Sequence, residues 1–412
     1  MRVCLIGPTH PCHNPRLVRE ADTLAERGHE VRVVAVRSVR ELVADDERLM
    51  ATRKWRLSTA NIQRSPWPHR IRAIPARLRL ESAARSFQRT GSAADAEIAL
   101  CEAAPELLRL AVREPAEWFI AHTQTVLATA AHATRKWNAR LGFDCEDLLS
   151  ETDLPDPEVV RVLERAYLPA CDYVSAASPV MAERLQQQYQ IPAPTVLYNV
   201  FPLAMATGLK PPEQRPPNAC LRLHWSGQTA GPGKGLEEAI KAAALAGGGV
   251  EVFIRGTPWG DFQATLSRMA REKNVPLTFL PHVPHDELVG TMGQFDIGLA
   301  LERASDRNYS ITVTNKFFSY MLAGLAIAAT DTPGQREVLQ QVPAAGFIYP
   351  CGCPEALAEQ FRRWRDNRDS LLTAQRAAWL AARDRYCWDV EKAKYLALFE
   401  RPAARQAVTC AT

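Results

Sequence analysis

The sequence predicts an α/β fold made of two domains that are built alike. The chain has 412 residues, more than one hydrophobic core usually serves. In both halves short apolar runs alternate with amphipathic helical patterns, which is typical of parallel strands covered by helices. A proline-rich stretch without periodicity, residues 202–217, separates the halves, and we interpret it as the domain boundary.

The first half opens with a strand, a loop and a helix. We expect a strand over Arg2–Gly7, an amphipathic helix over Arg16–Arg27 that ends at Gly28, and a second strand over Glu30–Val36. This order of elements predicts a Rossmann-like domain. The first loop contains Gly7 as its single glycine, so the G-x-G-x-x-G fingerprint is missing. A nicotinamide or flavin dehydrogenase is therefore disfavoured.

The strand pattern breaks off between Val39 and Arg113, and we expect a helical insertion over about residues 40–113. Within it, the segment Arg64–Arg89 is basic and carries interleaved apolar side chains. Two interpretations stay open. The segment contacts an acceptor or an anionic membrane surface, or it is a solvated helical hairpin with its arginines facing water.

Polar side chains follow the expected strands of the first half at the edge where open α/β sheets bind ligands. We expect further strands over residues 117–121, 140–144, 171–176 and 195–198, with helices between them. The candidates for contact with a substrate are Thr9, His10, His13, Asn14, Asp144, Glu146 and Asp147. The alternative is that these groups solvate turns or cap the next segment. His122 ends a strand and is either an acid, a base or a hydrogen-bond donor, or a structural histidine.

The second half repeats the alternation. We expect strands over residues 220–225, 250–255, 276–280, 297–301, 325–330 and 346–349, and a helical tail from residue 354 that ends with residues 388–400. The loop Ser226–Gly235 is rich in glycine but is no P-loop, because Gly235 follows Lys234 where Ser or Thr is required. Its lysine is either a phosphate contact or a surface side chain.

The stretch from Phe295 to Leu339 carries the strongest site signal. A buried strand is followed by a polar loop and a helix from Asn315, which Gly324 terminates. Thr312 and Thr314 are candidate caps, and Lys316 lies in the first turn, where its charge opposes the helix dipole. A negative group should compensate this lysine. We hypothesise that the helix start holds a nucleotide diphosphate; the alternative is an ordinary strand–loop–helix with an exposed lysine.

Bulk properties describe a soluble globular protein. The chain is 47% hydrophobic and 23% charged, and its net charge of +4 gives no argument for nucleic acid. The ten cysteines show no metal-ligand spacing. No signal peptide and no apolar run of membrane-spanning length is evident, so we expect a cytoplasmic protein. The abundance of arginine and alanine suggests a bacterial source.

In order and spacing, several segments together resemble the GT-B glycosyltransferases, in particular the large retaining family 4. They are NPRLVREADTLAERGHEVRVVA, WFIAHTQ, FDCEDLLSE and SAASPVMAERL in the first half, and WSGQTAGPGKGLEEAI, FLPHVPHDEL, FDIGLAL, TNKFFSYMLAGLAIAATDTPGQREV and YCWDVEKAKYLALFE in the second. The resemblance implies two Rossmann-like domains facing a central cleft. An N-terminal acceptor-binding domain would comprise residues 1–202, a nucleotide-sugar domain residues 218–385, and a crossing helix residues 386–412.

The resemblance also implies the partners. A nucleotide sugar with UDP or GDP would serve as substrate, without cofactor or metal, since no Asp-x-Asp motif is present. The acceptor would be a small molecule or a saccharide. The implied donor contacts are Gly227, Gln228, Lys234, Arg255, Gly256, His282, Val283, Thr312, Thr314, Asn315 and Lys316. Catalysis would involve His122, Lys234 and Lys316, with front-face attack by the acceptor and stabilisation of the leaving diphosphate.

The chain departs from the family pattern at three positions. The family's Glu-x7-Glu pair corresponds to Ile311 and Ser319, and its usual phosphate-binding arginine corresponds to Gln228. Arg255 is the expected substitute for that arginine. These departures motivate an alternative: a GT-B-like subunit that binds nucleotide sugar without turnover. A GT-B epimerase or pseudo-glycosyltransferase is a further alternative. Donor sugar, base, acceptor and bond formed stay open.

Overall fold

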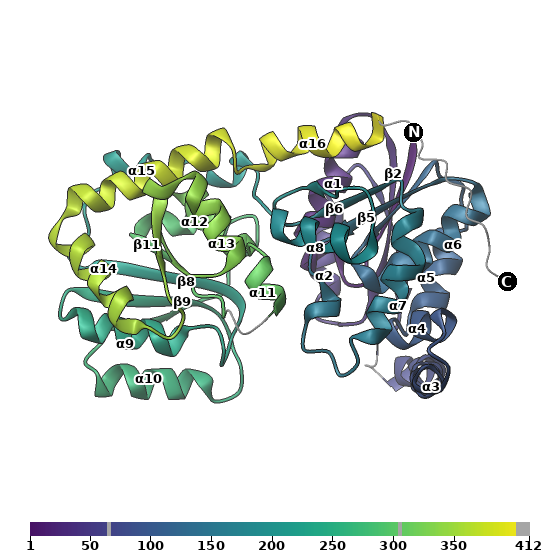
Figure 1. Ribbon diagram of the computed structural model, residues 1–412, viewed down its shortest axis with the longest axis horizontal. Helices are drawn as coiled ribbons and strands as arrows, with labels where there is room; N and C mark the ends of the chain where they lie inside the picture. The colour runs from purple at the N-terminus through teal and green to yellow at the C-terminus, as the bar shows by residue number, and fades with distance from the viewer. Residues whose placement is uncertain (64–66, 304–306, 401–412) are drawn as a thin grey trace. The chain divides into compact units, whose positions relative to one another are not determined.

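The computed structural model describes residues 1–63, 67–303 and 307–400 (Figure 1). The chain divides into two compact units. Unit 1 comprises Met1–Leu197 and the chain from Lys392 onward, and unit 2 comprises Tyr198–Glu391. The roles predicted for the domains, and the cleft between them, stay predictions.

Unit 1 is built on a parallel sheet with the strand order β3-β2-β1-β4-β5-β6-β7. Its strands are β1 (Arg2–Ile6), β2 (Glu30–Arg37), β3 (Arg56–Asn61), β4 (Trp118–His122), β5 (Arg140–Cys145), β6 (Tyr173–Ala176) and β7 (Thr195–Val196). The order reverses between β1 and β4, and ligands of open α/β sheets bind at such switch points. The loop after β1 and the residues after β4 therefore lie where a site is expected.

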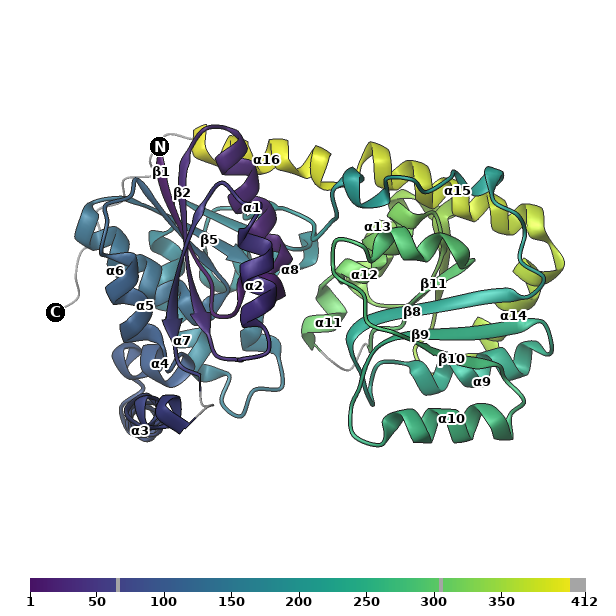
Figure 2. The same ribbon diagram turned by 180° about the vertical axis from the view of Figure 1, so that it is seen from behind.

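Helices cover both faces of this sheet. They are α1 (Pro15–Glu26), α2 (Val43–Met50), α3 (Trp67–Thr90), α4 (Ala93–Leu100), α5 (Ala104–Ala111), α6 (Leu127–Trp137), α7 (Glu158–Tyr167) and α8 (Pro179–Tyr189). Helices α1 and α8 lie on one side, and α5 and α6 on the other (Figure 2). Ser178 caps α8 by accepting a hydrogen bond from the Met181 amide.

The expected helical insertion also contains a strand. Residues Arg56–Asn61 form β3, which pairs with β2 in parallel from Arg32↔Arg56 to Arg37↔Asn61. The prediction missed it because β3 is an edge strand with one fully buried residue, Ala60. Such a strand has little apolar alternation to recognise.

The basic segment Arg64–Arg89 falls partly outside the described residues, since 64–66 are not described. The remainder lies in α3, where the side chains of Ile74 and Leu78 are 53% and 57% exposed. Contact of this helix with an anionic membrane stays a prediction, which cosedimentation with anionic vesicles tests. Across the described ranges, the length and apolarity that a bilayer span requires are not combined in any helix.

Unit 2 repeats the topology with the order β10-β9-β8-β11-β12-β13. Its strands are β8 (Leu221–Ala230), β9 (Val250–Pro258), β10 (Leu277–Leu280), β11 (Ile297–Ala300), β12 (Ala326–Thr330) and β13 (Gly346–Tyr349). The switch point lies between β8 and β11. Strand β8 continues past Trp225, where we expected a loop, through an irregularity between Ser226 and Thr229.

The helices of unit 2 are α9 (Leu236–Ala246), α10 (Phe262–Glu272), α11 (Arg307–Ile311), α12 (Asn315–Ala323), α13 (Pro333–Gln341), α14 (Pro354–Asp366) and α15 (Arg368–Asp384). Helices α9, α10 and α14 share one apolar core with the strands, to which the first turns of α15 also contribute, while α12 lies on the opposite side from α9 and α10 (Figure 2). Helix α12 begins at Asn315 and ends at Gly324 with φ 70°, as predicted. Helix α16 (Trp388–Glu400) begins in unit 2 and ends in unit 1.

Candidate functional site

Two helices begin beside the switch point of the unit 2 sheet. Helix α9 starts after Gly235, whose φ of 71° suits glycine, and a Cβ there would lie 2.5 Å from Cβ of Leu301. Because Gly235 has no side chain, the loop packs directly against Leu301, the residue that follows β11. At the start of α12, Thr314 makes no side-chain capping bond. Both helix starts therefore present amides without side-chain caps, an arrangement that favours an anion.

A buried carboxylate lies at the start of α12. Glu302 follows β11 and is 3% exposed, and its Oε1 is 2.6 Å from Nζ of Lys316, itself 11% exposed. The Thr314 hydroxyl donates to the same oxygen at 2.9 Å. Burial would raise the pKa of Glu302, but Lys316 and the Thr314 bond outweigh burial, and the pKa is lowered. The group expected to compensate Lys316 is therefore supplied by the protein, and the sequence analysis missed it.

A second lysine lies at the same edge of the sheet. Lys234 is half-buried, its Nζ donates to the Tyr309 hydroxyl at 3.1 Å, and it lies 4.4 Å from the centre of that ring. It also contributes to the lowered pKa of Glu302. Nζ of Lys316 lies 5.1 Å from the ring of Trp225. Lys234, Lys316 and Glu302 thus place charges of both signs at the switch point.

Arg255, the expected substitute for the missing phosphate-binding arginine, is buried and bonded within the protein. Arg255 is 6% exposed and donates from Nη1 to the Pro281 carbonyl at 2.5 Å. Burial lowers its pKa. Gly227 and Gly256 serve the close approach of β8 and β9, because a Cβ on Gly256 would lie 2.7 Å from the Gly227 carbonyl oxygen. Gln228 is exposed.

The remaining predicted donor residues lie on two loops and a helix start. His282 is exposed and Val283 half-buried in the loop after β10, and Asn315 is exposed at the start of α12. The capping predicted for the two threonines is wrong. Thr312 donates from its hydroxyl to Asn308 at 3.3 Å, and Thr314 donates to a carboxylate instead.

In unit 1, His122 is enclosed by carboxylates. Its ring is 0% exposed, with Nδ1 3.1 Å from Glu146 Oε1 and 3.5 Å from Asp144 Oδ2, and Nε2 3.4 Å from Glu20 Oε2. Burial alone would lower the pKa of His122, but the three carboxylates outweigh it and raise the pKa to about 10. The ring is thus held as a cation. Direct contact of this buried ring with a sugar is not favoured by the arrangement.

Arg16 explains why Asp144 is not available to an acceptor. From α1 its Nε and Nη2 donate to the two Asp144 oxygens at 2.6 Å each, and Nη1 donates to the Leu197 carbonyl at 2.7 Å. Ser175 donates to Asp144 as well, at 2.6 Å. Glu20, His122 and Asp144 are near enough to one another to hold a metal ion. The guanidinium of Arg16 already supplies positive charge at this carboxylate, which opposes a metal there.

The accessible part of this cluster is small. Glu146 is 17% exposed, and Asn14 donates to its Oε1 at 2.8 Å while capping α1 through the Leu17 amide. Thr9 and Asp147 are half-buried and His13 is exposed. Arg16 and Glu20 were missed, although their i, i+4 spacing on one helix was a usable signal.

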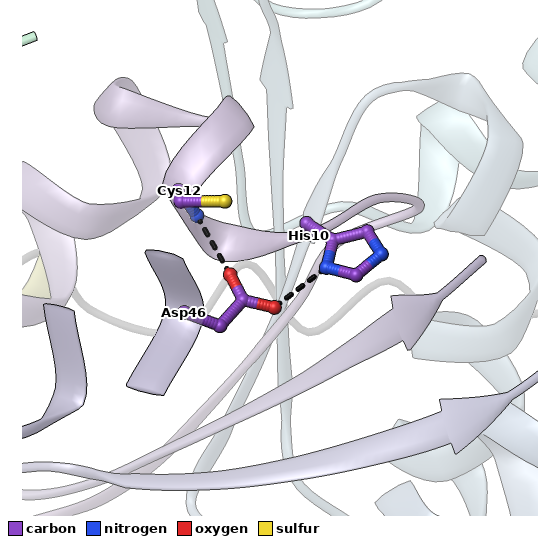
Figure 3. A group of neighbouring side chains, drawn as sticks. All are labelled: His10, Cys12 and Asp46. Atoms are coloured by element: carbon purple, nitrogen blue, oxygen red, sulfur yellow. Dashed lines mark hydrogen bonds and ion pairs between the residues drawn. The ribbon is translucent and has the colours of Figure 1, made fainter. Parts of the chain in front are cut away.

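His10 belongs to a separate, saturated cluster (Figure 3). Its Nδ1 is 2.6 Å from Oδ2 of Asp46, and its Nε2 accepts from the amides of Ser38 and Val39 at 3.0 Å each. The other Asp46 oxygen accepts from the Cys12 amide at 3.1 Å. Both ring nitrogens are therefore engaged in fixing this loop, which leaves the predicted acceptor contact by His10 without a free atom.

Thr123, directly after His122, has a backbone conformation that β-branched residues avoid. Its φ is 72° and its ψ 160°, a region adopted almost only by glycine. The amide donates to the Asp144 carbonyl at 3.0 Å, and the buried hydroxyl oxygen has no hydrogen-bond partner among the described residues. Backbone strain of this kind is commonly found at functional sites.

Thr123→Gly is expected to raise the free energy of unfolding by about 1 kcal/mol, because relief of roughly 1–3 kcal/mol of strain exceeds the entropy cost of glycine. Asn138→Gly is the matched control, since Asn138 also has a positive φ of 48°, yet asparagine tolerates that region. Urea unfolding of both variants measures the difference. Destabilisation by Thr123→Gly would show that the backbone carries no strain.

Residues 234–397 match a family model described as glycosyl transferase-like. No curated protein sequence matches the chain. Solved structures similar to it include the Anabaena protein Alr3699/HepE in complex with UDP, at 14% identity and a TM-score of 0.69, covering 97% of this chain and 100% of that one.

Two further structures are similar over the same length. Sucrose-phosphate synthase from Thermosynechococcus elongatus has 13% identity and a TM-score of 0.65, covering 97% of this chain and 98% of that one. A UDP-forming α,α-trehalose-phosphate synthase from Burkholderia vietnamiensis has 13% identity and a TM-score of 0.63, covering 97% and 100%. At these identities the likeness shows the fold. The chain thus has the two-domain α/β architecture of GT-B proteins, and its second half contains a glycosyltransferase-like domain.

Proposed function

We propose that this protein is a retaining glycosyltransferase that moves a sugar from a nucleoside-diphosphate sugar to a hydroxyl of an acceptor without a metal ion. The observation that carries the proposal is the pairing of two uncapped helix starts with Lys234 and Lys316 at the unit 2 switch point. Helix amides and ammonium groups bind a diphosphate and stabilise the charge that grows on it as it leaves.

The donor base is proposed to be uracil. Solved structures with this fold include one in complex with UDP and one in complex with UDP-glucose. His282 and Val283, in the loop after β10, are the proposed base contacts. The resemblance of the sequence to family 4 is the reason to expect that the configuration at the anomeric carbon is retained.

In the proposed step, the bond from the anomeric carbon to the diphosphate oxygen breaks, and the bond to the acceptor oxygen forms on the same face. The acceptor proton passes to the departing phosphate oxygen, so no separate base is needed. The protein contributes orientation and electrostatic stabilisation. Lys234 is the cation that stabilises the leaving group, since its ring and hydroxyl contacts with Tyr309 are exchangeable for phosphate.

The acceptor is proposed to contact the accessible residues at the unit 1 switch point, Glu146, Thr9 and His13, beside the buried Asn14. Glu146 is a hydrogen-bond acceptor for a sugar hydroxyl, and Asn14 and His122 hold its carboxylate in place. His122 is therefore proposed as a positioning residue. A saccharide or a small hydroxylated molecule fits these groups.

The test combines calorimetry with a transfer assay. Purified protein in EDTA is titrated with UDP and GDP, and UDP-sugars are then screened for hydrolysis or transfer by mass spectrometry, with the anomer assigned by NMR. We expect micromolar UDP binding and slow hydrolysis of at least one donor. Binding without any turnover would instead favour a nucleotide-sugar-binding subunit, and absence of nucleotide binding would reject the diphosphate site.

A further inference from the structure

We propose that Glu302 is a buried counter-charge that weakens the hold of the donor site on the nucleoside diphosphate left after transfer, and so promotes product release. The inference rests on the proposed function, because it concerns the same diphosphate site. It assigns a role to a residue outside the donor contacts and outside the family's Glu-x7-Glu positions, which are Ile311 and Ser319 here.

The geometry links Glu302 to both lysines of the site. Its carboxylate pairs with Lys316 at 2.6 Å and accepts from Thr314 at 2.9 Å. Lys234 interacts with it electrostatically. The backbone is fixed as well, because the Glu302 carbonyl accepts from the Thr330 hydroxyl at 2.5 Å. A charge held this rigidly with 3% exposure is little screened by solvent.

Two other roles fit Glu302 poorly. Contact with a donor hydroxyl requires an accessible carboxylate, and this side chain is almost completely buried. As a metal ligand it would have to bind a cation beside the ammonium of Lys316, which lies 2.6 Å from its Oε1 and would repel the metal. A merely structural ion pair is the remaining alternative, and it differs from our proposal in its effect on ligand affinity.

The electrostatic argument concerns the difference between donor and product. The terminal phosphate of a free nucleoside diphosphate carries about one negative charge more than the same phosphate esterified to a sugar. A fixed carboxylate behind the site repels this extra charge, so it weakens the binding of the product more than that of the donor. Without Glu302, the positive charge of Lys316 would strengthen the binding of the product more than that of the donor.

Glu302→Gln keeps the shape of the side chain and removes the charge. We expect UDP to bind roughly tenfold more tightly to this variant, with a smaller gain for UDP-sugar. Inorganic pyrophosphate should raise its melting temperature more than that of the wild type. The matched control is Glu337→Gln, a carboxylate of unit 2 that accepts from the Tyr198 hydroxyl at 3.2 Å and from the Gln341 amide at 2.9 Å.

The outcomes separate the two proposals. A wild type that binds neither UDP nor pyrophosphate overturns the proposed function. A wild type that binds UDP, together with unchanged or weaker UDP binding by Glu302→Gln, overturns the role of Glu302 alone. If Glu302→Gln does not fold, the wild type itself is titrated with UDP and with UDP-sugar. The two affinities should lie within about tenfold of each other, because the fixed carboxylate offsets the gain from the extra charge of UDP, and much tighter binding of UDP than of the donor overturns the inference.

Discussion

Arg16→Met is expected to lower the free energy of unfolding of unit 1 by about 3–5 kcal/mol, because it leaves buried carboxylates without their counter-ion. Arg16 is 1% exposed and bridges Asp144 to the Leu197 carbonyl. Methionine fills similar volume but donates no hydrogen bond, so Asp144 loses its bidentate partner and keeps only His122 as a neighbouring cation, or takes up a proton. Denaturant unfolding followed by far-UV circular dichroism measures the loss.

Arg56→Met is the control for this experiment. Arg56 bridges Glu30 and Glu114 at the surface, with 55% of its side chain exposed, and such pairs contribute about 0–1 kcal/mol. Equal effects of the two variants would show that the buried network does not stabilise unit 1 beyond ordinary surface pairs.

The same network gives the stability of unit 1 a defined pH dependence. The pKa of Asp144 is lowered: burial opposes this, but the charges of Arg16 and His122 prevail, so its contribution is lost as the solution becomes acidic enough to protonate it. The pKa of His122 is raised to about 10. Its contribution is complete below its ordinary pKa of about 6.5 and is lost as pH rises through about 10. Arg16→Met should lessen the acid sensitivity that Asp144 confers.

Much of the fold follows from local sequence. Apolar runs short enough for buried strands, with helices between them, predicted both sheets, because each signal lies within a few neighbouring residues. Gly324, which follows an apolar helical pattern, predicted the end of α12 for the same reason. The edge strand β3 was not predicted because it lacks an apolar pattern of its own. It is a strand because it pairs with β2.

The site was less predictable because its decisive contacts join distant residues. Glu302 and Lys316 lie 14 positions apart, and the two lysines are brought to one edge by the strand order. His10 and His122 are equally polar in sequence, yet both are fully buried and engaged. Burial of a histidine depends on what packs around it, and a single strand-end pattern does not contain that information.

Lys234→Met is expected to lower kcat/KM for the donor by roughly 10²–10³-fold, the cost of removing one preorganised group that stabilises the leaving charge. Lys234 is the cleaner probe of the two lysines. Removal of Lys316 would leave Glu302 buried and unpaired, so a loss of activity would be mixed with a loss of stability. Removal of Lys234 takes one hydrogen bond and one ring contact from Tyr309 but leaves the Glu302–Lys316 ion pair in place.

Lys241→Met supplies the control, because Lys241 lies on the exposed side of α9, the helix that begins directly after the Lys234 loop. Initial rates over a range of donor concentrations in EDTA separate kcat from KM. If Lys234 acts on the leaving diphosphate, kcat falls together with kcat/KM, because the interaction strengthens in the transition state. A rise in KM alone would mean that Lys234 binds donor and transition state equally, and parallel behaviour of the two variants would remove Lys234 from the site.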